Sequence, residues 1–448
     1  MTAPLDHLTA QLLDAARKAG ADGADVIAVR GTSLSIRVRE GALEQADRSE
    51  GIDLGLRVLV GQRQASVSSS DDKPDTIAQM AERAVAMAKE APEDPYAGLA
   101  DPSELTTNTD LKSLELSDPS DEPDPAALQD AAIRAEAAAL ANKGISQVQS
   151  AAAGYGHRQA HIAATNGFSA GYARTDHGLS CVAISGAGTE MERDYDYDSR
   201  VFGADMRDAA DIGRIAAERA VARAGARKPP TGAFPVMFDE RIASTLIGSI
   251  LQATNGQVIA RGSGWLRDKL GEQILPKGIS LTEEPHRKRT SSSRLFDAEG
   301  LATASRKIVD DGILTGWTTD LATARQLNVT KTANAVRGTS SPPSPGVTNV
   351  TLTQGDQTQA ELLADMGTGL LVTSLIGSTI NPNTGDYSRG ASGFWVENGE
   401  ITYPVNECTI AGNLRDMLMT ITPANDARAH LSRVVPSLLI EGMTLAGN

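Results

Sequence analysis

The spacing of apolar residues in the first 90 positions predicts a helix, several strands and a second helix. Between residues 5 and 19, Leu8, Leu12 and Ala16 recur near one face of a helix, and Gly20 follows as a natural stop. Alternation of apolar and polar residues in SLSIRVR (33–39) predicts a strand with one buried face. Residues 52–68 predict a hairpin that turns at Gly61-Gln62, and a helix then runs to about residue 89.

The pattern changes after residue 90 and then returns. Residues 91–125 contain six prolines and many acidic and hydroxyl side chains, which predicts a linker or an exposed extended segment. Residues 126–228 again predict a helix, short strands with glycine-containing turns, and a closing helix. Both closing helices contain the string AERAVA, at 81–86 and 217–222. This match is weak support for a duplication, because alanine-rich helices produce such strings by chance.

The stretch KPPTGAF (228–234) predicts a boundary before a third region. A strand at 235–238 and a helix at 239–255 open this region, and the remainder is largely β, with a hairpin signal at Asn398-Gly399. We therefore predict an α+β protein, with antiparallel sheet and flanking helices in the N-terminal half and a mainly β C-terminal domain. The predicted divisions are an N-terminal α+β unit at 1–90, a proline-rich acidic linker at 91–125, a central α+β unit at 126–228 and the C-terminal mainly β domain at 229–448.

Composition narrows the classes of partner. The net charge of −15 argues against a reader of duplex DNA, which needs a basic surface. The one dense basic cluster, HRKRTSSSR (286–294), is read as a solvated loop. No apolar run approaches the 18 residues of a membrane helix, the start lacks the pattern of a signal peptide, and two cysteines make no disulfide framework. We expect a cytoplasmic protein with no nucleic-acid or membrane partner.

Several histidines, cysteines and serines are candidates for catalysis or metal binding. His157 and His161 lie in a predicted strand, where four residues span about 13 Å, so they cannot chelate one ion. His177 and Cys181 lack the second pair of ligands that a structural zinc site usually has. No phosphate-binding or dinucleotide-binding loop occurs, and GASG (390–393) is one residue short of the nucleophile elbow of a serine hydrolase.

An unusual concentration of aromatic residues occurs in GDYSRGASGFWVENGEITYPV (385–405). One interpretation is a loop that presents Tyr387, Ser388 and Arg389 to a peptide or a partner. The other is a turn fixed by contact between Asp386 and Arg389, followed by a strand through Phe394 and Trp395. Residue chemistry alone favours the second interpretation.

This tract, together with TIAGNLRDM (409–417) and MGTGLLVTSLIG (366–377), resembles the TldE (PmbA) branch of the TldD/PmbA family. The resemblance implies a metalloprotease made of two related subunits. In the TldD-type subunit, a helix carries HExxxH and a later Cys is a third zinc ligand. The corresponding helix here, 239–255, contains no His, and the corresponding later stretch, 430–436, contains no Cys.

The resemblance and the missing ligands together predict a subunit without catalytic or metal-binding residues. We expect no cofactor on this chain, zinc in a TldD-like HExxxH partner, and unfolded or small peptides as substrates; alone, the chain can also pair with itself. The candidates for an interface or substrate groove are Asp386, Tyr387, Ser388, Arg389, Phe394 and Trp395. The alternatives are a regulatory protein of the DNA gyrase modulator type and, less favoured, a hydrolase that uses Ser388 or Ser392.

Overall fold

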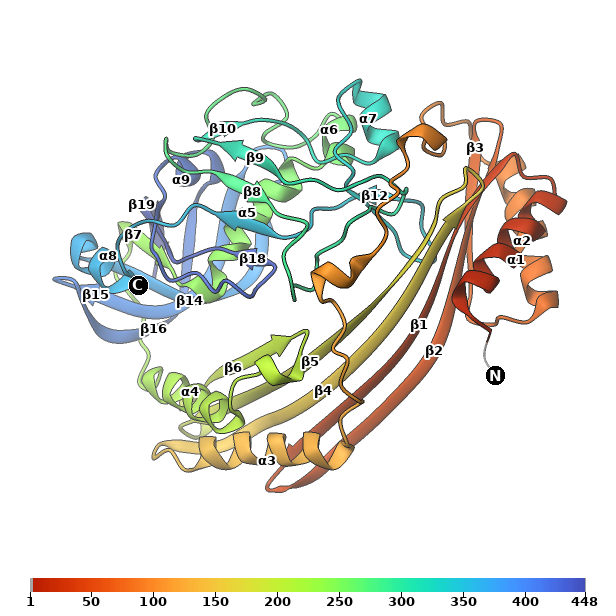
Figure 1. Cartoon of the computed structure of the whole chain (residues 1–448). Helices are drawn as coiled ribbons and strands as arrows, with labels where there is room; N and C mark the ends of the chain where they lie inside the picture. The colour runs from red at the N-terminus through yellow and green to blue at the C-terminus, as the bar shows by residue number, and fades with distance from the viewer. Residues whose placement is uncertain (1–2, 448) are drawn as a thin grey trace.

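The computed structural model describes residues 3–447, and it places most of the N-terminal half in one curved antiparallel sheet (Figure 1). The order of strands across this sheet is β3-β2-β1-β4-β5-β6. The strands are β1 (Gly23–Arg39), β2 (Ala42–Val60), β3 (Arg63–Ser69), β4 (Ile145–Ala164), β5 (Ser169–Ser185) and β6 (Glu192–Arg200). The α+β class and the antiparallel N-terminal sheet predicted from the sequence are confirmed.

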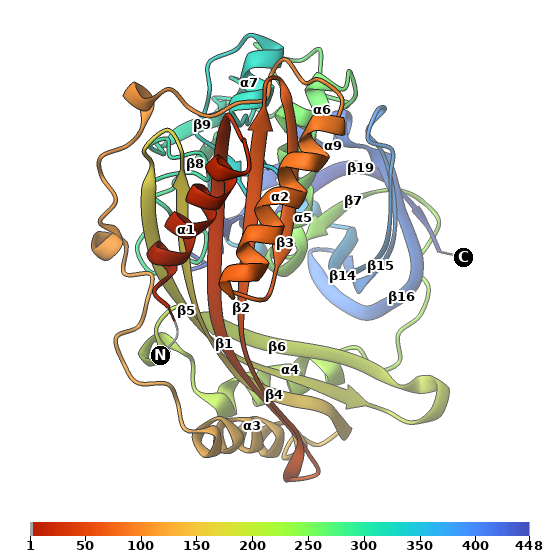
Figure 2. The same cartoon turned by 90° about the vertical axis from the view of Figure 1, so that its right-hand side faces the viewer.

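Two pairs of helices cover the convex face of the sheet, one pair near each end. The helices are α1 (Leu5–Lys18), α2 (Pro74–Glu90), α3 (Pro125–Leu140) and α4 (Ala209–Ala222). Figure 2 shows α1 and α2 lying across the strands of the first half. Strand β1 serves both pairs, because Val26 packs in the α1–α2 core and Ile36, on the same face, packs in the α3–α4 core.

The two halves of the sheet are related in their topology. Each half consists of a helix, three strands and a second helix, and the first strands of the halves, β1 and β4, pair at the centre. The two AERAVA strings lie in equivalent helices, α2 and α4, with Ala81 and Ala217 both buried. This arrangement supports the duplication that the repeated string suggested.

The strands are longer than the sequence pattern predicted. The hairpin between β2 and β3 turns at Gly61, where φ is +58°, as predicted. However, β2 begins at Ala42, ten residues before the predicted strand, and these ten residues are all exposed. They form a strand because they pair residue by residue with β1, and not because they bury one face.

Residues 91–124 pass from α2 to α3 and contact both halves of the molecule. They contain two short 3-10 turns, Pro102–Glu104 and Leu111–Leu114. Leu114 and Leu116 are buried in a cluster with Ile27 and Val29 of β1. The boundaries proposed for a linker remain a prediction, but this segment is packed along much of its length.

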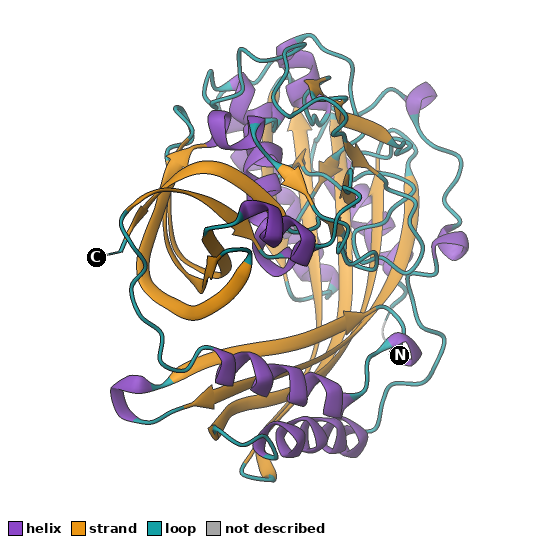
Figure 3. Cartoon of the chain, turned by 90° about the vertical axis from the view of Figure 1, so that its left-hand side faces the viewer, coloured by secondary structure: helices purple, strands orange, loops and turns teal. Residues whose placement is uncertain are grey.

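The C-terminal half contains a closed barrel, whose curling strands are seen in Figure 3. The order β16-β15-β14-β7-β19 is closed by pairing between β16 and β19, with β17 at the side of β19. These strands are β7 (Gly232–Phe238), β14 (Gly369–Ile380), β15 (Asp386–Glu397), β16 (Glu400–Asn413), β17 (Thr422–Pro423) and β19 (Leu438–Ala446). Helix α5 (Glu240–Ala253) buries Leu246, Ile247 and Ile250 in the barrel core.

Smaller elements surround the barrel. A second sheet has the order β10-β9-β8-β13-β18, and β11 pairs with β12. These strands are β8 (Leu281–Glu283), β9 (Arg306–Asp310), β10 (Ile313–Leu314), β11 (Ala335–Val336), β12 (Ser344–Pro345), β13 (Val350–Leu352) and β18 (Arg433–Val434). The accompanying helices are α6 (Gly256–Ala260), α7 (Leu321–Leu327), α8 (Gln359–Met366) and α9 (Leu414–Met419). The prediction of a mainly β C-terminal domain is confirmed.

A buried charge cluster joins the sheet to the C-terminal half on the concave side. Asp25 of β1 accepts a hydrogen bond of 2.5 Å from Nε of Arg57 and also contacts Arg337, whose side chain is fully buried. Next to this cluster, a Cβ on Gly55 would lie 2.3 Å from the carbonyl oxygen of Thr339, so only glycine fits there. The two halves are therefore held in close contact. No helix within residues 3–447 has the length and hydropathy that a membrane crossing requires.

Candidate functional site

Helix α5 has one apolar face and one polar face. Asp239 caps its first turn by accepting a hydrogen bond of 3.1 Å from the backbone N–H of Arg241. The apolar face points into the barrel core, while Ser244, Thr245 and Gly248 are at least partly exposed on the other side. The helix agrees closely with the prediction at 239–255. Its polar face is built from small residues and is open for contact with another segment.

The segment 428–434 lies along this polar face. Arg428 Nε donates a hydrogen bond of 2.7 Å to Glu240 Oε2 at the start of α5. Further along, a Cβ on Gly248 would lie 3.2 Å from Nη1 of Arg433. The two segments that the resemblance associates with metal ligands are therefore neighbours in space, although about 180 residues separate them in the sequence.

The side chains at this place do not fit a zinc ion. Zinc is bound in proteins by Cys, His and carboxylate groups, whereas Gly248, Ser244 and Thr245 offer none of these, and Arg433 brings a positive charge. Within the described part of the chain, no group of three or more His, Cys, Asp or Glu side chains is placed to hold a metal ion. No catalytic step through a metal is therefore derived for this chain.

Three aspartates of β6 connect the sheet to this region. Alternation in ERDYDYDSR places Asp194, Asp196 and Asp198 on one face, and all three are buried. Asp194 accepts a hydrogen bond of 3.0 Å from Arg241 of α5, and Asp198 lies 3.6 Å from Nε2 of His430. Burial alone would raise the pKa of Asp198, but hydrogen bonds from Arg207 and Arg200 outweigh it and hold this pKa below its ordinary value.

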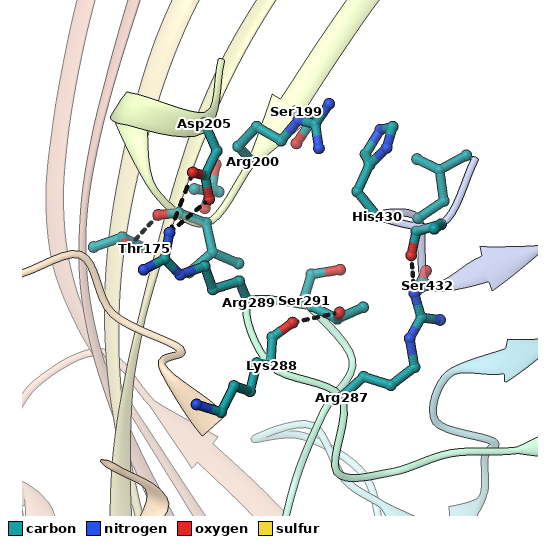
Figure 4. Close-up of a pocket in the computed structure, with 15 residues that line it drawn as sticks. Thr175, Ser199, Arg200, Asp205, Arg287, Lys288, Arg289, Ser291, His430 and Ser432 are labelled. Atoms are coloured by element: carbon teal, nitrogen blue, oxygen red, sulfur yellow. Dashed lines mark hydrogen bonds and ion pairs between the residues drawn. The ribbon is translucent and has the colours of Figure 1, made fainter. Parts of the chain in front are cut away.

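A cavity of about 390 Å³ lies beside this connection, between the sheet and the C-terminal half (Figure 4). Its basic lining residues are Arg200, Arg287, Lys288, Arg289 and His430. Three of these belong to the cluster 286–294, which was predicted to be a solvated loop. The side chains of Lys288 and Arg289 are exposed, although Arg289 also binds Glu115 and Asp205 and stacks on Phe202.

The tract 385–405 forms β15, a turn and the first part of β16. Tyr387 and Trp395 are buried in the barrel core, whereas Asp386, Ser388, Arg389 and Phe394 are at least partly exposed. The structure thus separates the six candidates into a buried pair and four surface residues. Trp395 is fixed by a hydrogen bond of 3.0 Å from Nε1 to Glu397 and by edge-on contact with Phe234.

The predicted turn contact between Asp386 and Arg389 is wrong. Asp386 accepts hydrogen bonds from Thr384 and Asn413, and Arg389 Nε donates a bond of 2.7 Å to the carbonyl of Gly377. The reason is that β15 already begins at Asp386, and side chains three residues apart on a strand point to opposite faces.

The remaining candidates for chemistry have structural partners. His161 lies in β4, as predicted, and its Nδ1 is 2.8 Å from the hydroxyl of Thr9; His177 Nε2 lies 3.4 Å from Asp118. Burial raises the pKa of the Cys181 thiol to about 12 and that of Cys408 to about 11, so neither is a reactive thiolate at neutral pH. Ser392 is buried and accepts a hydrogen bond of 2.8 Å from Arg223. A guanidinium cannot act as the general base that a serine nucleophile needs.

The chain is similar to known proteins along most of its length. Three models of PmbA/TldA metallopeptidase domains match: domain 1 at residues 24–88, the central domain at 118–224 and the C-terminal domain at 231–447. Metalloprotease PmbA of Escherichia coli O157:H7 is 36% identical over 95% of this chain and 92% of its own length. The metalloprotease PmbA homolog of Haemophilus influenzae is also 36% identical, over 97% of this chain and 94% of its own length.

Solved structures share the fold. A Bacteroides thetaiotaomicron protein named for modulation of DNA gyrase has a TM-score of 0.90 and 28% identity, covering 99% of this chain and 98% of that one. TldE of Thermococcus kodakarensis has a TM-score of 0.84 and 19% identity, covering 98% of this chain and 100% of that one. The second likeness, at this low identity, shows the fold alone.

Proposed function

Because the chain belongs to the PmbA/TldA metallopeptidase family, we propose that it is the subunit of a heteromeric zinc metalloprotease that does not itself hold the zinc. Its partner would be a TldD-type chain that carries HExxxH, and the substrates would be unfolded or small peptides. The assembly would act in the cytoplasm. This chain would complete the enclosure in which the partner's zinc works.

One observation carries this proposal: Arg433 lies over Gly248 of α5, the helix that the resemblance matches to the HExxxH helix of the TldD-type subunit. A guanidinium there opposes a divalent cation, and a single substitution cannot create both the missing His and Cys ligands and the Glu that would act as general base. A chain that kept its own activity would need these donors. The surface instead carries small residues, Arg433 and the ion pair between Arg428 and Glu240, which suits contact with a peptide backbone or with a partner chain.

The aromatic tract has two roles in this proposal. Its buried members, Tyr387 and Trp395, would be framework residues of the barrel. Its exposed members, with Arg389 at the centre, would contribute to the interface with the partner or to the substrate groove. Ile376 supports the interface role, because it is paired across the hairpin with Gly390 and its side chain is 70% exposed.

Metal analysis of the purified chain tests the absence of its own zinc site. After dialysis against zinc-containing buffer and gel filtration, we expect far less than one zinc per chain, and no hydrolysis of a casein-derived peptide. The TldD-type relative treated in the same way is the positive control. One tightly bound zinc per chain, together with peptidase activity of this chain alone, would contradict the proposal.

A regulatory protein-binding role is the second candidate, and the relative named for modulation of DNA gyrase favours it. The net charge of −15 permits contact with a basic protein surface. Saturable binding of this chain to purified gyrase, with no effect on the peptidase activity of the relative, would favour this second role.

A further inference from the structure

The cavity beside His430 is large enough to hold the end of a peptide. Its volume of about 390 Å³ lies within the range of small-ligand sites. Its wall combines the β5–β6 end of the sheet, the loop 287–291 and the segment 429–432 (Figure 4). Because these three segments come from both halves of the molecule, a ligand here would contact both.

Basic groups in the wall outnumber acidic ones. Four side chains are cationic, namely Arg200, Arg287, Lys288 and Arg289, and two are carboxylates, Asp176 and Asp205. Not all of this positive charge is available to a ligand. Lys288 is bound to Glu115, and Arg289 is bound to both Glu115 and Asp205.

Arg287 is the cation that lacks a negative partner. Nη2 donates a hydrogen bond to the carbonyl oxygen of Ala429, while Nη1 is buried and has no partner. Within residues 3–447, no carboxylate forms an ion pair with this guanidinium. Burial lowers the pKa of Arg287, and the charge of Glu284 opposes this shift only in part. An anionic oxygen of a ligand would remove this cost.

A second group of donors lies across the cavity from Arg287. Arg200 Nε donates a hydrogen bond of 3.0 Å to the carboxylate of Asp198. The two terminal nitrogens of Arg200 have no acceptor in the described part of the chain. Figure 4 shows its guanidinium near the ring of His430, with the hydroxyl-bearing residues Ser291 and Ser432 between this side and Arg287. A planar anion can therefore be held by guanidinium groups from two directions.

We propose that this cavity binds the carboxylate at the C-terminal end of a peptide. Edge strand β18 starts at Arg433, directly after the cavity residue Ser432, and is the last strand of its sheet. The chain thus leads from the cavity directly into this sheet, where an extended peptide main chain could add by backbone hydrogen bonds. Val201 and Leu431 in the wall give apolar contact to the last side chain. This inference rests on the proposed role in peptide hydrolysis.

A binding experiment with the isolated full-length chain tests the inference. Two fluorescein-labelled peptides of the same unstructured sequence, about ten residues long, would end in a free carboxylate or in a carboxamide. We expect fluorescence anisotropy to show about tenfold tighter binding of the carboxylate form. Arg287→Gln should remove this difference, whereas Arg17→Gln, an exposed arginine on α1, should preserve it.

Two further measurements keep the result interpretable. Ser291→Glu places a carboxylate at an exposed position of the wall and should abolish the preference without touching Arg287. Circular dichroism and the thermal midpoint would establish that each variant is folded. Inorganic phosphate at millimolar concentration is the competitor that tests for a general anion site.

Equal affinity for the two peptides, or a preference that survives Arg287→Gln, would overturn the inference. If phosphate displaced both peptides and their affinities were equal, the inference would also be overturned. The cavity would then be a site for inorganic anions. The binding experiment is read separately from the test of the proposed function, which is hydrolysis in a mixture with the relative. An active mixture without carboxylate preference would refute only the cavity inference, and a clear preference in an inactive mixture would refute only the proposed function.

Discussion

Arg433 of the short strand β18 lies against Gly248 of α5, and a Cβ at position 248 would be 3.2 Å from its Nη1. This contact brings together the two segments that the resemblance associates with metal ligands in the TldD-type subunit. An exposed guanidinium, and not a set of metal ligands, faces the helix here. The proposed role of this chain as a partner subunit depends on the presence of Arg433 where metal ligands would be needed.

The two faces of α5 should respond differently to substitution. Gly248→Ala should change the free energy of unfolding by less than about 1 kcal/mol, because the gain in helix propensity offsets a small displacement of the exposed Arg433 side chain. Leu246→Ala, in the fully buried core, should lose about 3 kcal/mol. Urea denaturation measures both. A loss for Gly248→Ala as large as that for Leu246→Ala would show that the polar face is tightly packed.

Asp25 should be essential for the contact between the sheet and the C-terminal half. Asp25→Asn leaves the buried guanidinium groups of Arg57 and Arg337 without their anion, so we expect a loss of about 3–5 kcal/mol in the free energy of unfolding. Asp14→Asn on the exposed face of α1 is the matched control and should leave the thermal midpoint unchanged. An unchanged midpoint for Asp25→Asn would show that this cluster does not join the two halves.

Glu299 should make the protein less stable as the pH rises from about 5 to about 8. Burial, followed by repulsion from Asp297, raises the pKa of Glu299 to about 8, from an ordinary value of 4.5. The folded state therefore keeps this proton while the unfolded state releases it, and stability is lost as the pH rises through this window. Glu299→Gln should reduce the loss between pH 5 and pH 8 by more than about 1 kcal/mol.

Urea denaturation of both proteins at several pH values measures this difference. Gln keeps an oxygen that can accept the hydrogen bond from the backbone N–H of Leu321, so the comparison isolates the charge. Identical pH profiles for Glu299→Gln and the wild-type chain would refute the assignment of a raised pKa.

Surface residues of the β14–β15 hairpin should contribute to association and not to folding. Ile376→Ser should weaken binding to the TldD-type relative by about tenfold with an unchanged thermal midpoint, because this side chain is 70% exposed. Leu43→Ser, at an exposed site on β2, is the control and should bind normally. Trp395→Ala should instead cost about 3–5 kcal/mol of stability. Sedimentation velocity would measure association, and normal binding by Ile376→Ser would remove this hairpin from the interface.

The amino-acid pattern predicted those elements that bury one face. Helix α5 and the hairpin at Gly61 follow from apolar periodicity and from turn residues, which act locally. The first ten residues of β2 could not be predicted in this way, because they are exposed throughout and are strand only through pairing with β1. Closure of the barrel likewise depends on pairing between β16 and β19, which no local pattern records.

The candidate site was predictable only in part. The absence of zinc ligands follows directly from the residue types in α5 and in 430–436. The cavity does not, because Arg200, Arg287 and His430 are far apart in the sequence and meet only after folding. The alternating acids of ERDYDYDSR and the basic cluster 286–294 were visible in the sequence, but no local pattern shows which partners they reach: Asp198 lies beside His430, and Arg289 binds Glu115 and Asp205.

Hydrolysis of one unfolded peptide by three samples tests the central claim most directly: this chain alone, its HExxxH relative alone, and an equimolar mixture with added zinc. The account predicts activity that is confined to the mixture or is raised at least about tenfold there. Equal activity of the relative with and without this chain would contradict the account. Hydrolysis by this chain alone would contradict it as well, because it would require catalytic groups that α5 and its neighbours do not supply.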